Sequence, residues 1–124
     1  MYSLLIVEDE ENVRSSLISF FEDLDYKIYY AENGEDALEI LNRHSINAAI
    51  VDVRLPGMDG TEFVKKAVLI NDKTVFIFHT GSPEFIYPEI LVDNIRVSEH
   101  VFYKPVYDLN ELNNAIISMI KELE

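Results

Sequence analysis

Three carboxylates, one hydroxyl and one amine each follow a short apolar segment of this sequence, and together these groups could do chemistry. They belong to Glu8, Asp9, Asp52, Thr80 and Lys104. Carboxylates held a few ångströms apart do not all stay ionised at neutral pH unless a cation joins them, and Mg²⁺ is a hard cation that prefers oxygen ligands. Two charges from the metal and one from Lys104 balance three carboxylates. The residue types therefore predict a metal cradle.

Asp52 differs from the other acids because it is the only acid at the end of its apolar segment, where Val51 and Val53 flank it. A positioned carboxylate can accept a phosphoryl group and form an acyl phosphate. The loose transition state of that transfer requires the protein mainly to position groups and to neutralise the equatorial oxygens. Mg²⁺, Lys104 and the Thr80 hydroxyl suit this task, so Asp52 is the candidate nucleophile.

Five apolar segments rich in β-branched or aromatic residues predict the strands that position these groups. They are Ser3–Val7, Lys27–Ala31, Asn47–Val51, Thr74–Phe78 and His100–Tyr103. Helical spacing of apolar residues follows each of the first three strands, and Asp108 is a predicted N-cap for a last amphipathic helix. Nearly continuous apolar strands that alternate with helices form a parallel sheet covered on both faces. The pattern predicts an α/β, doubly wound fold of five βα units, with function at the carboxyl ends of the strands.

The connection between the fourth and fifth predicted strands departs from this pattern. Pro83 could begin a helix, but Pro88 would then lie inside it, where proline removes a hydrogen bond and clashes with the preceding turn. We expect a short or displaced helix from about Pro88 to about Asn94. We also expect exposed side chains in this connection, at Phe85, Ile86 and Tyr87.

Length, composition and charge limit the classes of protein. The 124 residues, 48% of them hydrophobic, predict one domain over residues 1–124 without an effector domain. A net charge of −13 argues against direct binding to nucleic acid or to an anionic membrane. The absence of cysteine excludes disulfides and thiolate metal sites. The N-terminal apolar segment is too short for a signal or a membrane span, so we expect a cytoplasmic location.

Four motifs, in order on the predicted βα units, carry a resemblance to a known family: IVEDE, IVDVRLPGMDG, HTG and FYKP. They resemble the receiver domain of two-component response regulators, over the whole chain. The resemblance implies a flavodoxin-like, three-layer sandwich with strand order 2-1-3-4-5. It implies a phosphorelay in which Asp52 accepts a phosphoryl group from a sensor histidine kinase or a phosphotransfer protein, or from a small acyl phosphate.

The same resemblance implies roles for the other site residues. Asp9, Asp52 and the backbone carbonyl of Arg54 would ligate Mg²⁺, with Glu8 acting through water. Thr80 and Lys104 would contact the phosphoryl group, and a cis peptide bond before Pro105 would turn the lysine toward the site. Phosphorylation would switch the surface around the fourth helix and fifth strand toward a downstream protein partner. The domain would be a phosphoacceptor, not an enzyme beyond its own phosphorylation and dephosphorylation.

One departure from the family pattern keeps an alternative open. Val101 stands three residues before Lys104, where many receivers carry an aromatic residue, and the aromatic residues here are Phe102 and Tyr103. Strand alternation places Val101 and Tyr103 on one face and Phe102 on the other, so a conventional rotamer switch would be absent. The alternative is a phosphate-independent pseudo-receiver that acts as an interaction module. A phosphatase of the aspartyl-phosphate type would need its nucleophile on the opening strand and a second acid two residues later. Here the candidate nucleophile follows the third strand and the residue two places later is Arg54, so this enzyme class is disfavoured.

Overall fold

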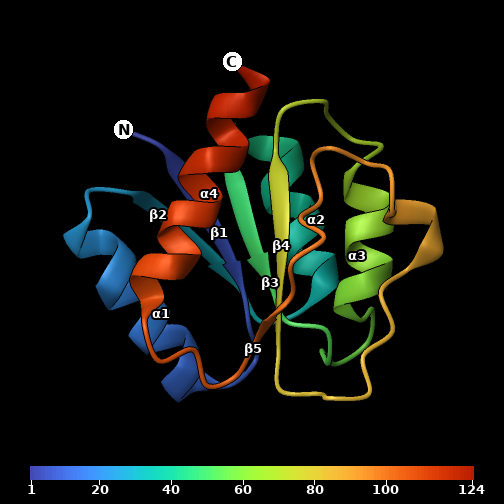
Figure 1. The fold of residues 1–124 in the computed structure, drawn as a ribbon, viewed down its shortest axis with the longest axis horizontal. Coiled ribbons are helices and arrows are strands. Elements are labelled where there is room, and N and C mark those ends of the chain that lie inside the picture. Colours follow the sequence, from blue (N-terminus) through green and yellow to red (C-terminus); the bar gives the residue numbers. More distant parts are fainter.

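A computed structural model describes all residues 1–124 and shows a five-stranded parallel sheet in the order β2-β1-β3-β4-β5 (Figure 1). The strands are β1 Ser3–Val7, β2 Lys27–Ala31, β3 Ala48–Val51, β4 Val75–Thr80 and β5 Phe102–Tyr103. The predicted doubly wound fold and its strand order are confirmed. The predicted bounds are correct for β1 and β2, whereas β5 is half as long as expected. A bend occupies the residues just before β5, and in it the Ser98 hydroxyl donates to the His100 carbonyl at 3.0 Å. The strand therefore begins only at Phe102.

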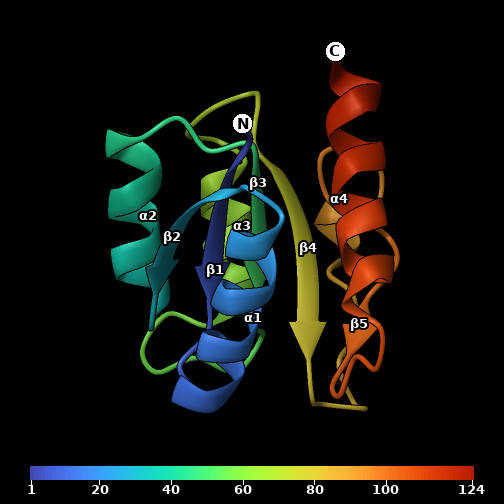
Figure 2. The same cartoon turned by 90° about the vertical axis from the view of Figure 1, so that its left-hand side faces the viewer.

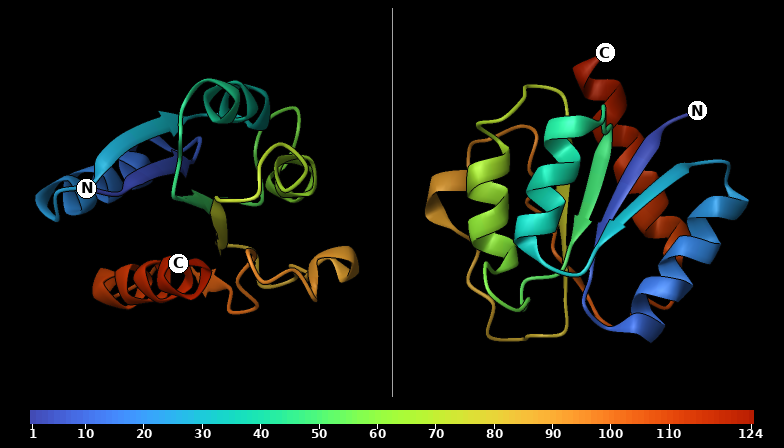
Figure 3. Two further views of the ribbon diagram at one scale, coloured as in Figure 1. Left: turned by 90° about the horizontal axis from the view of Figure 1, so that it is seen from above. Right: turned by 180° about the vertical axis from the view of Figure 1, so that it is seen from behind.

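Four α-helices cover the two faces of the sheet (Figures 2 and 3). Their bounds are α1 Glu11–Asp23, α2 Gly34–Arg43, α3 Gly60–Ala67 and α4 Leu109–Leu123. Helices α2 and α3 pack on one face and α1 and α4 on the other, each through its apolar stripe. The predicted N-cap of the last helix is confirmed, because Asp108 Oδ1 accepts from Asn110 N at 3.0 Å. No helix combines the length and the apolar character needed to cross a bilayer.

The core consists of two apolar layers, one on each side of the sheet. Successive residues of a strand point to opposite faces, so Leu5 and Val7 of β1 join the layer beneath α2 and α3, while Leu4 and Ile6 join the layer beneath α1 and α4. All four of these side chains are buried. Apolar packing on both faces therefore fixes the position of the central strands. The polar residues that follow their carboxyl ends are held together at one edge of the sheet.

The connection from β4 to β5 has almost no helix. Only the 3-10 helix η1, Glu89–Leu91, forms, with Pro88 just before it. The predicted short helix near Pro88 is therefore present but shorter than expected, because consecutive i→i+3 bonds end with the bond from Val92 N to the Glu89 carbonyl. The predicted exposure is correct for Ile86, at 86%, whereas Phe85 and Tyr87 are half-buried. Their rings pack on Phe78 at centroid distances of 5.1 and 6.0 Å and cover part of β4.

Arg96 anchors the same connection to the sheet. Its guanidinium donates to the Val68 carbonyl at 2.8 Å and to the Thr74 carbonyl at 3.2 Å. Its own carbonyl accepts from Phe76 N at 2.7 Å, which places Val97 beside β4 as an isolated parallel bridge. These bonds hold the connection against β4. They determine the path of a segment that has no longer helix to do so.

Candidate functional site

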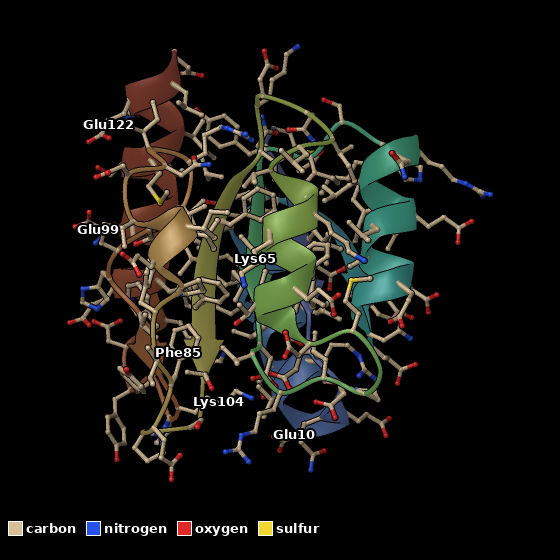
Figure 4. All side chains as sticks on the ribbon, turned by 90° about the vertical axis from the view of Figure 1, so that its right-hand side faces the viewer. Glu10, Lys65, Phe85, Glu99, Lys104 and Glu122 are labelled. Carbon is tan, nitrogen blue, oxygen red and sulfur yellow. The ribbon has the colours of Figure 1, made fainter.

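A cavity of about 440 Å³ lies at the carboxyl ends of β1, β3 and β4. Most of its lining residues are charged or polar: Asp9, Glu10, Asp52, Arg54, Thr80, Gly81, Ser82, Pro83, Glu84 and Lys104. Figure 4 shows Lys104 and Glu10 close to this end of the sheet. Glu8 lies next to the cavity through its ion pair with Lys104. The other residues predicted from the sequence line it: Asp9, Asp52, Arg54, Thr80 and Lys104.

Lys104 is the cationic centre of the site. Its ammonium lies 2.8 Å from Glu8 Oε1, 3.1 Å from Asp52 Oδ2 and 3.6 Å from Glu10 Oε1. Burial lowers the pKa of Lys104, but the contact with Glu8 and the charge of Asp52 outweigh that effect and leave the pKa above its ordinary value. The lysine therefore stays charged and neutralises part of the acidic cluster.

Glu8 is the acid of the site whose ionised form is most disfavoured by its surroundings. Its side chain is only 1% exposed, and this burial, with the nearby charge of Asp52, raises the pKa of Glu8 to about 7 even though Lys104 opposes the shift. The buried Oε1 atom has the Lys104 ammonium beside it at 2.8 Å. A buried carboxylate whose charge is only partly compensated gains stability from a further cation.

The carboxylates fit a hard divalent cation. One oxygen each from Glu8, Glu10 and Asp52 lie within 4.8 Å of one another, which is compatible with a shared ion that prefers oxygen ligands. Sequence reasoning assigned no role to Glu10. Its backbone N–H donates to Glu8 Oε2 at 3.3 Å, so the turn after β1 brings both side chains to the same place. Asp9 lines the cavity with an exposed side chain and lies outside this closest group.

Thr80 is fully buried at the end of β4 and faces the cavity. Its hydroxyl oxygen accepts from Ser82 N at 3.1 Å, and its carbonyl accepts from Lys104 N at 2.8 Å. The second bond fixes the start of the Lys104 segment against β4. The Lys104–Pro105 peptide bond is cis, as the resemblance implied. The Lys104 side chain points toward the carboxylates of Glu8 and Asp52.

A small polar bridge crosses the mouth of the cavity. Arg54 Nη2 donates to Ser82 Oγ at 3.3 Å and lies 3.7 Å from Glu84 Oε2. Ser82 Oγ donates to the same Glu84 oxygen at 2.9 Å. Arg54 and Glu84 are both largely exposed, so their ion pair is screened by solvent and contributes little stability. The bridge nevertheless joins the loop after β3 to the loop after β4.

Two residues outside the cavity fix the backbone of the site. Arg14 Nη1 donates to the Glu8 carbonyl at 3.1 Å and holds the turn that carries the first acids. Gly60 lies against β3: a Cβ atom there would come within 1.9 Å of the Asp52 carbonyl oxygen, so no larger residue fits without moving the loop. Sequence reasoning missed Arg14, since one exposed-looking arginine in an amphipathic helix has no distinctive pattern.

His79 lies beside Thr80 on β4 but belongs to the opposite face. It is 4% exposed, and its Nδ1 atom has no hydrogen-bond partner. Burial, reinforced by the positive charge of Lys104, lowers the pKa of His79 to about 4. The imidazole is therefore neutral at physiological pH and contributes no charge to the acidic cluster.

Comparison with known proteins agrees with this geometry. A model of the response regulator receiver domain family matches residues 4–116. Sporulation initiation phosphotransferase F of Bacillus subtilis (strain 168) is 30% identical over 118 residues, which make up 91% of this chain and 89% of that protein. Regulatory protein AtoC of Escherichia coli (strain K12) is 31% identical over 110 residues, which make up 89% of this chain but 23% of AtoC. The chain belongs to the response regulator receiver domain family.

Solved structures share the fold. The receiver domain of the hybrid histidine kinase CckA has a TM-score of 0.76 and 28% identity, with 95% of this chain and 98% of that chain covered. The response regulator TrrA of Thermotoga maritima, solved in complex with Mg²⁺-BeF, has a TM-score of 0.80 and 24% identity, with 96% and 99% covered. The fold of this chain is therefore that of the receiver domain.

Proposed function

We propose that the chain is a phosphoacceptor of a two-component phosphorelay and that Asp52 is the residue phosphorylated. The observation that carries the proposal is the position of Asp52, buried at the end of β3 and 3.1 Å from the only ammonium in the cavity. Membership of the receiver family supports a signalling role rather than classical enzyme activity. The donor would be a phosphohistidine on a sensor histidine kinase or a phosphotransfer protein, or a small acyl phosphate.

In this transfer an Asp52 carboxylate oxygen attacks the phosphorus atom of the phosphohistidine. A new P–O bond forms, the P–N bond breaks, and the released imidazole nitrogen takes up a proton. Lys104 pairs with a phosphoryl oxygen, and the Thr80 hydroxyl, whose oxygen accepts from Ser82 N, donates its own hydrogen to another phosphoryl oxygen. The chain supplies position and charge, and the reacting phosphoryl group comes from the donor.

Mg²⁺ is the proposed cofactor, and when bound it supplies positive charge to the phosphoryl oxygens and to the carboxylates. The proposed ligands are Asp9, Asp52 and the Arg54 carbonyl, with Glu8 acting through water. The structure adds Glu10 as a candidate, because its carboxylate lies with those of Glu8 and Asp52. The buried Glu8 carboxylate, whose pKa stays at about 7 beside Lys104, supports a further cation at this position.

Phosphorylation would act on the surface formed by η1, β5 and the connection between them. Lys104 lies at the start of the loop after β5, and its N–H is bonded to Thr80, so both proposed phosphoryl contacts sit beside this surface. A movement of Thr80 or Lys104 would therefore change the shape of this surface and alter its binding to a downstream protein partner.

A second candidate, a phosphate-independent interaction module, is favoured by one observation. Val101 packs with the layer of apolar residues that contains Leu91 and Val97, and Phe102 packs in the opposite layer. No aromatic side chain at position 101 is available to rotate with Thr80. A domain of this kind would use its surface without a phosphorylation switch.

Intact mass separates the two candidates. The native chain, Asp52→Asn and the control Asp72→Asn, an exposed acid away from the cavity, are incubated with acetyl phosphate, with Mg²⁺ or with EDTA. A gain of ~80 Da that requires Mg²⁺, persists in Asp72→Asn and is lost in Asp52→Asn supports the phosphoacceptor. The interaction module is supported instead by the absence of any gain at short and long times in a chain that binds Mg²⁺.

A further inference from the structure

A second cavity, of about 330 Å³, lies on the face of the sheet that α1 and α4 cover, between α1 and the loop from β5 to α4 (Figure 1). Lys104 is the one residue that it shares with the cavity around Asp52. No carboxylate lines this second cavity, although the whole chain carries a net charge of −13. Its chemistry therefore differs from that of the acidic site.

The walls of the cavity are mainly apolar. On α1, Val13 and Leu17 lie one turn apart on the same side of the helix, and Ser16, with its small side chain, stands next to Leu17 and leaves room between the elements. Val106 of the loop and Leu109, the first residue of α4, form the other wall. The four apolar residues pack with the layer beneath α1 and α4, so the walls are held by the core.

His79 lines the cavity at a position where an apolar residue is expected. Val75, Ile77 and His79 alternate along β4, which directs all three side chains to the face beneath α1 and α4. Val75 and Ile77 are fully buried in the apolar layer, and His79 is only 4% exposed. The Nδ1 atom of His79 has no hydrogen-bond partner. A buried imidazole without a partner costs free energy that an apolar side chain at this position would avoid.

Apolar walls around one polar group are typical of sites for small molecules. Such pockets have volumes of about 300–1,000 Å³, so this cavity suits a ligand at the small end of the range. We propose that it binds a small, neutral, ring-shaped molecule that carries a hydroxyl group. The ring lies between the apolar walls, and the hydroxyl forms a hydrogen bond with the His79 imidazole, either as donor or as acceptor.

The charges around the cavity favour a neutral ligand. His79 is itself neutral at physiological pH, because burial and the charge of Lys104 lower its pKa to about 4. The Lys104 ammonium is the only charged group in the lining, and it already contacts Glu8 and Asp52. An anionic ligand would compete with these two carboxylates for the same cation, and a cationic ligand would find no acid in the lining.

The inference goes beyond the proposed function, since it assigns a ligand class to a cavity that does not contain Asp52. Binding of a neutral molecule needs neither a phosphoryl group nor Mg²⁺, so it is expected in EDTA and also in Asp52→Asn. Failure of phosphorylation and failure of this binding are therefore distinguishable.

The experiment uses 4-methylphenol as the probe and toluene, which has the same ring and methyl group without the hydroxyl, as its control. Both are titrated into the full chain in EDTA, and methyl NMR signals of Val13, Leu17, Val106 and Leu109 report occupation of the cavity.

Two pairs of variants are compared with the native chain. Ser16→Leu fills the space beside α1, and its control Ser15→Leu makes the same change at an exposed neighbour outside the lining. His79→Leu removes the polar group, and its control His44→Gln alters an exposed histidine outside the cavity.

We expect both probes to shift the four methyl signals to saturation, with 4-methylphenol bound at least threefold more tightly than toluene. Ser16→Leu should lower both affinities at least tenfold and Ser15→Leu less than twofold. The preference for 4-methylphenol should disappear in His79→Leu and remain in His44→Gln. If His79→Leu does not fold, the two probes and the serine pair still decide.

Three results would overturn the proposal. The first is equal affinity of the native chain for the two probes, because the imidazole would then contribute nothing. The second is an equal effect of Ser16→Leu and Ser15→Leu, and the third is the absence of saturable shifts at the four methyl groups, which would mean that the cavity holds only water.

Discussion

The Lys104 ammonium lies 2.8 Å from Oε1 of Glu8, a carboxylate that is almost completely buried. Each charge limits the cost of burying the other, but neither is fully compensated, since Glu8 still has a pKa of about 7. The charge of this pair, and with it the stability of the proposed phosphoryl site, should therefore depend on pH and on bound cations.

Replacement of Lys104 tests this pair in the absence of metal. Lys104→Met keeps most of the apolar stem but leaves Glu8 and Asp52 without their cation, and we expect a loss of about 2–4 kcal/mol in the free energy of unfolding at pH 8. The loss should be smaller at pH 5.5, where Glu8 is protonated in both proteins. Urea unfolding measures it, and Lys73→Met, at an exposed lysine, is the control. An equal loss at both pH values would contradict the role of the Glu8 charge.

Mg²⁺ should stabilise the folded chain. A ligand that binds only the folded state at about 100 times its dissociation constant adds about 2.7 kcal/mol, so Tm should rise when EDTA is replaced by excess Mg²⁺. Asp9→Asn and Glu10→Gln should each reduce this rise, and Glu11→Gln, at a neighbouring acid outside the closest group, should retain it. If all three variants respond as the native chain does, the metal does not bind at this loop.

His79 predicts a loss of stability in acid. Its pKa is about 4 in the folded chain against an ordinary value of 6.5, so the unfolded chain binds more protons between these values. The contribution to stability is complete above pH 6.5 and is lost as the pH falls toward 4, by an amount on the order of 3 kcal/mol. His79→Leu should flatten this part of the pH profile measured by urea unfolding. The exposed variant His100→Gln should keep the native profile, and a native profile in His79→Leu would refute the assignment.

Glu84 should slow phosphorylation by small anionic donors. Its carboxylate lies on the rim of the cavity, where it repels the incoming phosphate, although solvent screens much of the effect. Glu84→Gln should therefore be phosphorylated by acetyl phosphate about two to five times faster at low salt, with the difference reduced at high salt. Mass spectrometry over time gives the rates, and Glu89→Gln, outside the cavity, is the matched control. A slower reaction in Glu84→Gln would assign the carboxylate a positioning role instead.

The fold could be predicted from the sequence because strand and helix periodicity is strong where both faces of the sheet are buried. The five residues singled out at strand ends converge for the same reason, since parallel strands finish at one edge. Glu10 was missed because the path of a tight turn decides which of several consecutive acids points inward, and periodicity says nothing about that path. The partial burial of Phe85 and Tyr87 depends on their contact with Phe78, and a connection without regular apolar spacing does not predict such a tertiary contact.

The short β5 also affects how copies of the chain can meet. An exposed sheet edge can template the addition of a foreign strand, and the hazard grows with the length of free backbone that it offers. At the β5 edge only two residues are in strand conformation, and a proline without an N–H group follows soon after them. The β2 edge is five residues long, with Lys27 at its start. If partially unfolded chains aggregate through intermolecular β-sheet, the contact is therefore expected at β2, and mutations that add charge there would protect the protein better than changes at β5.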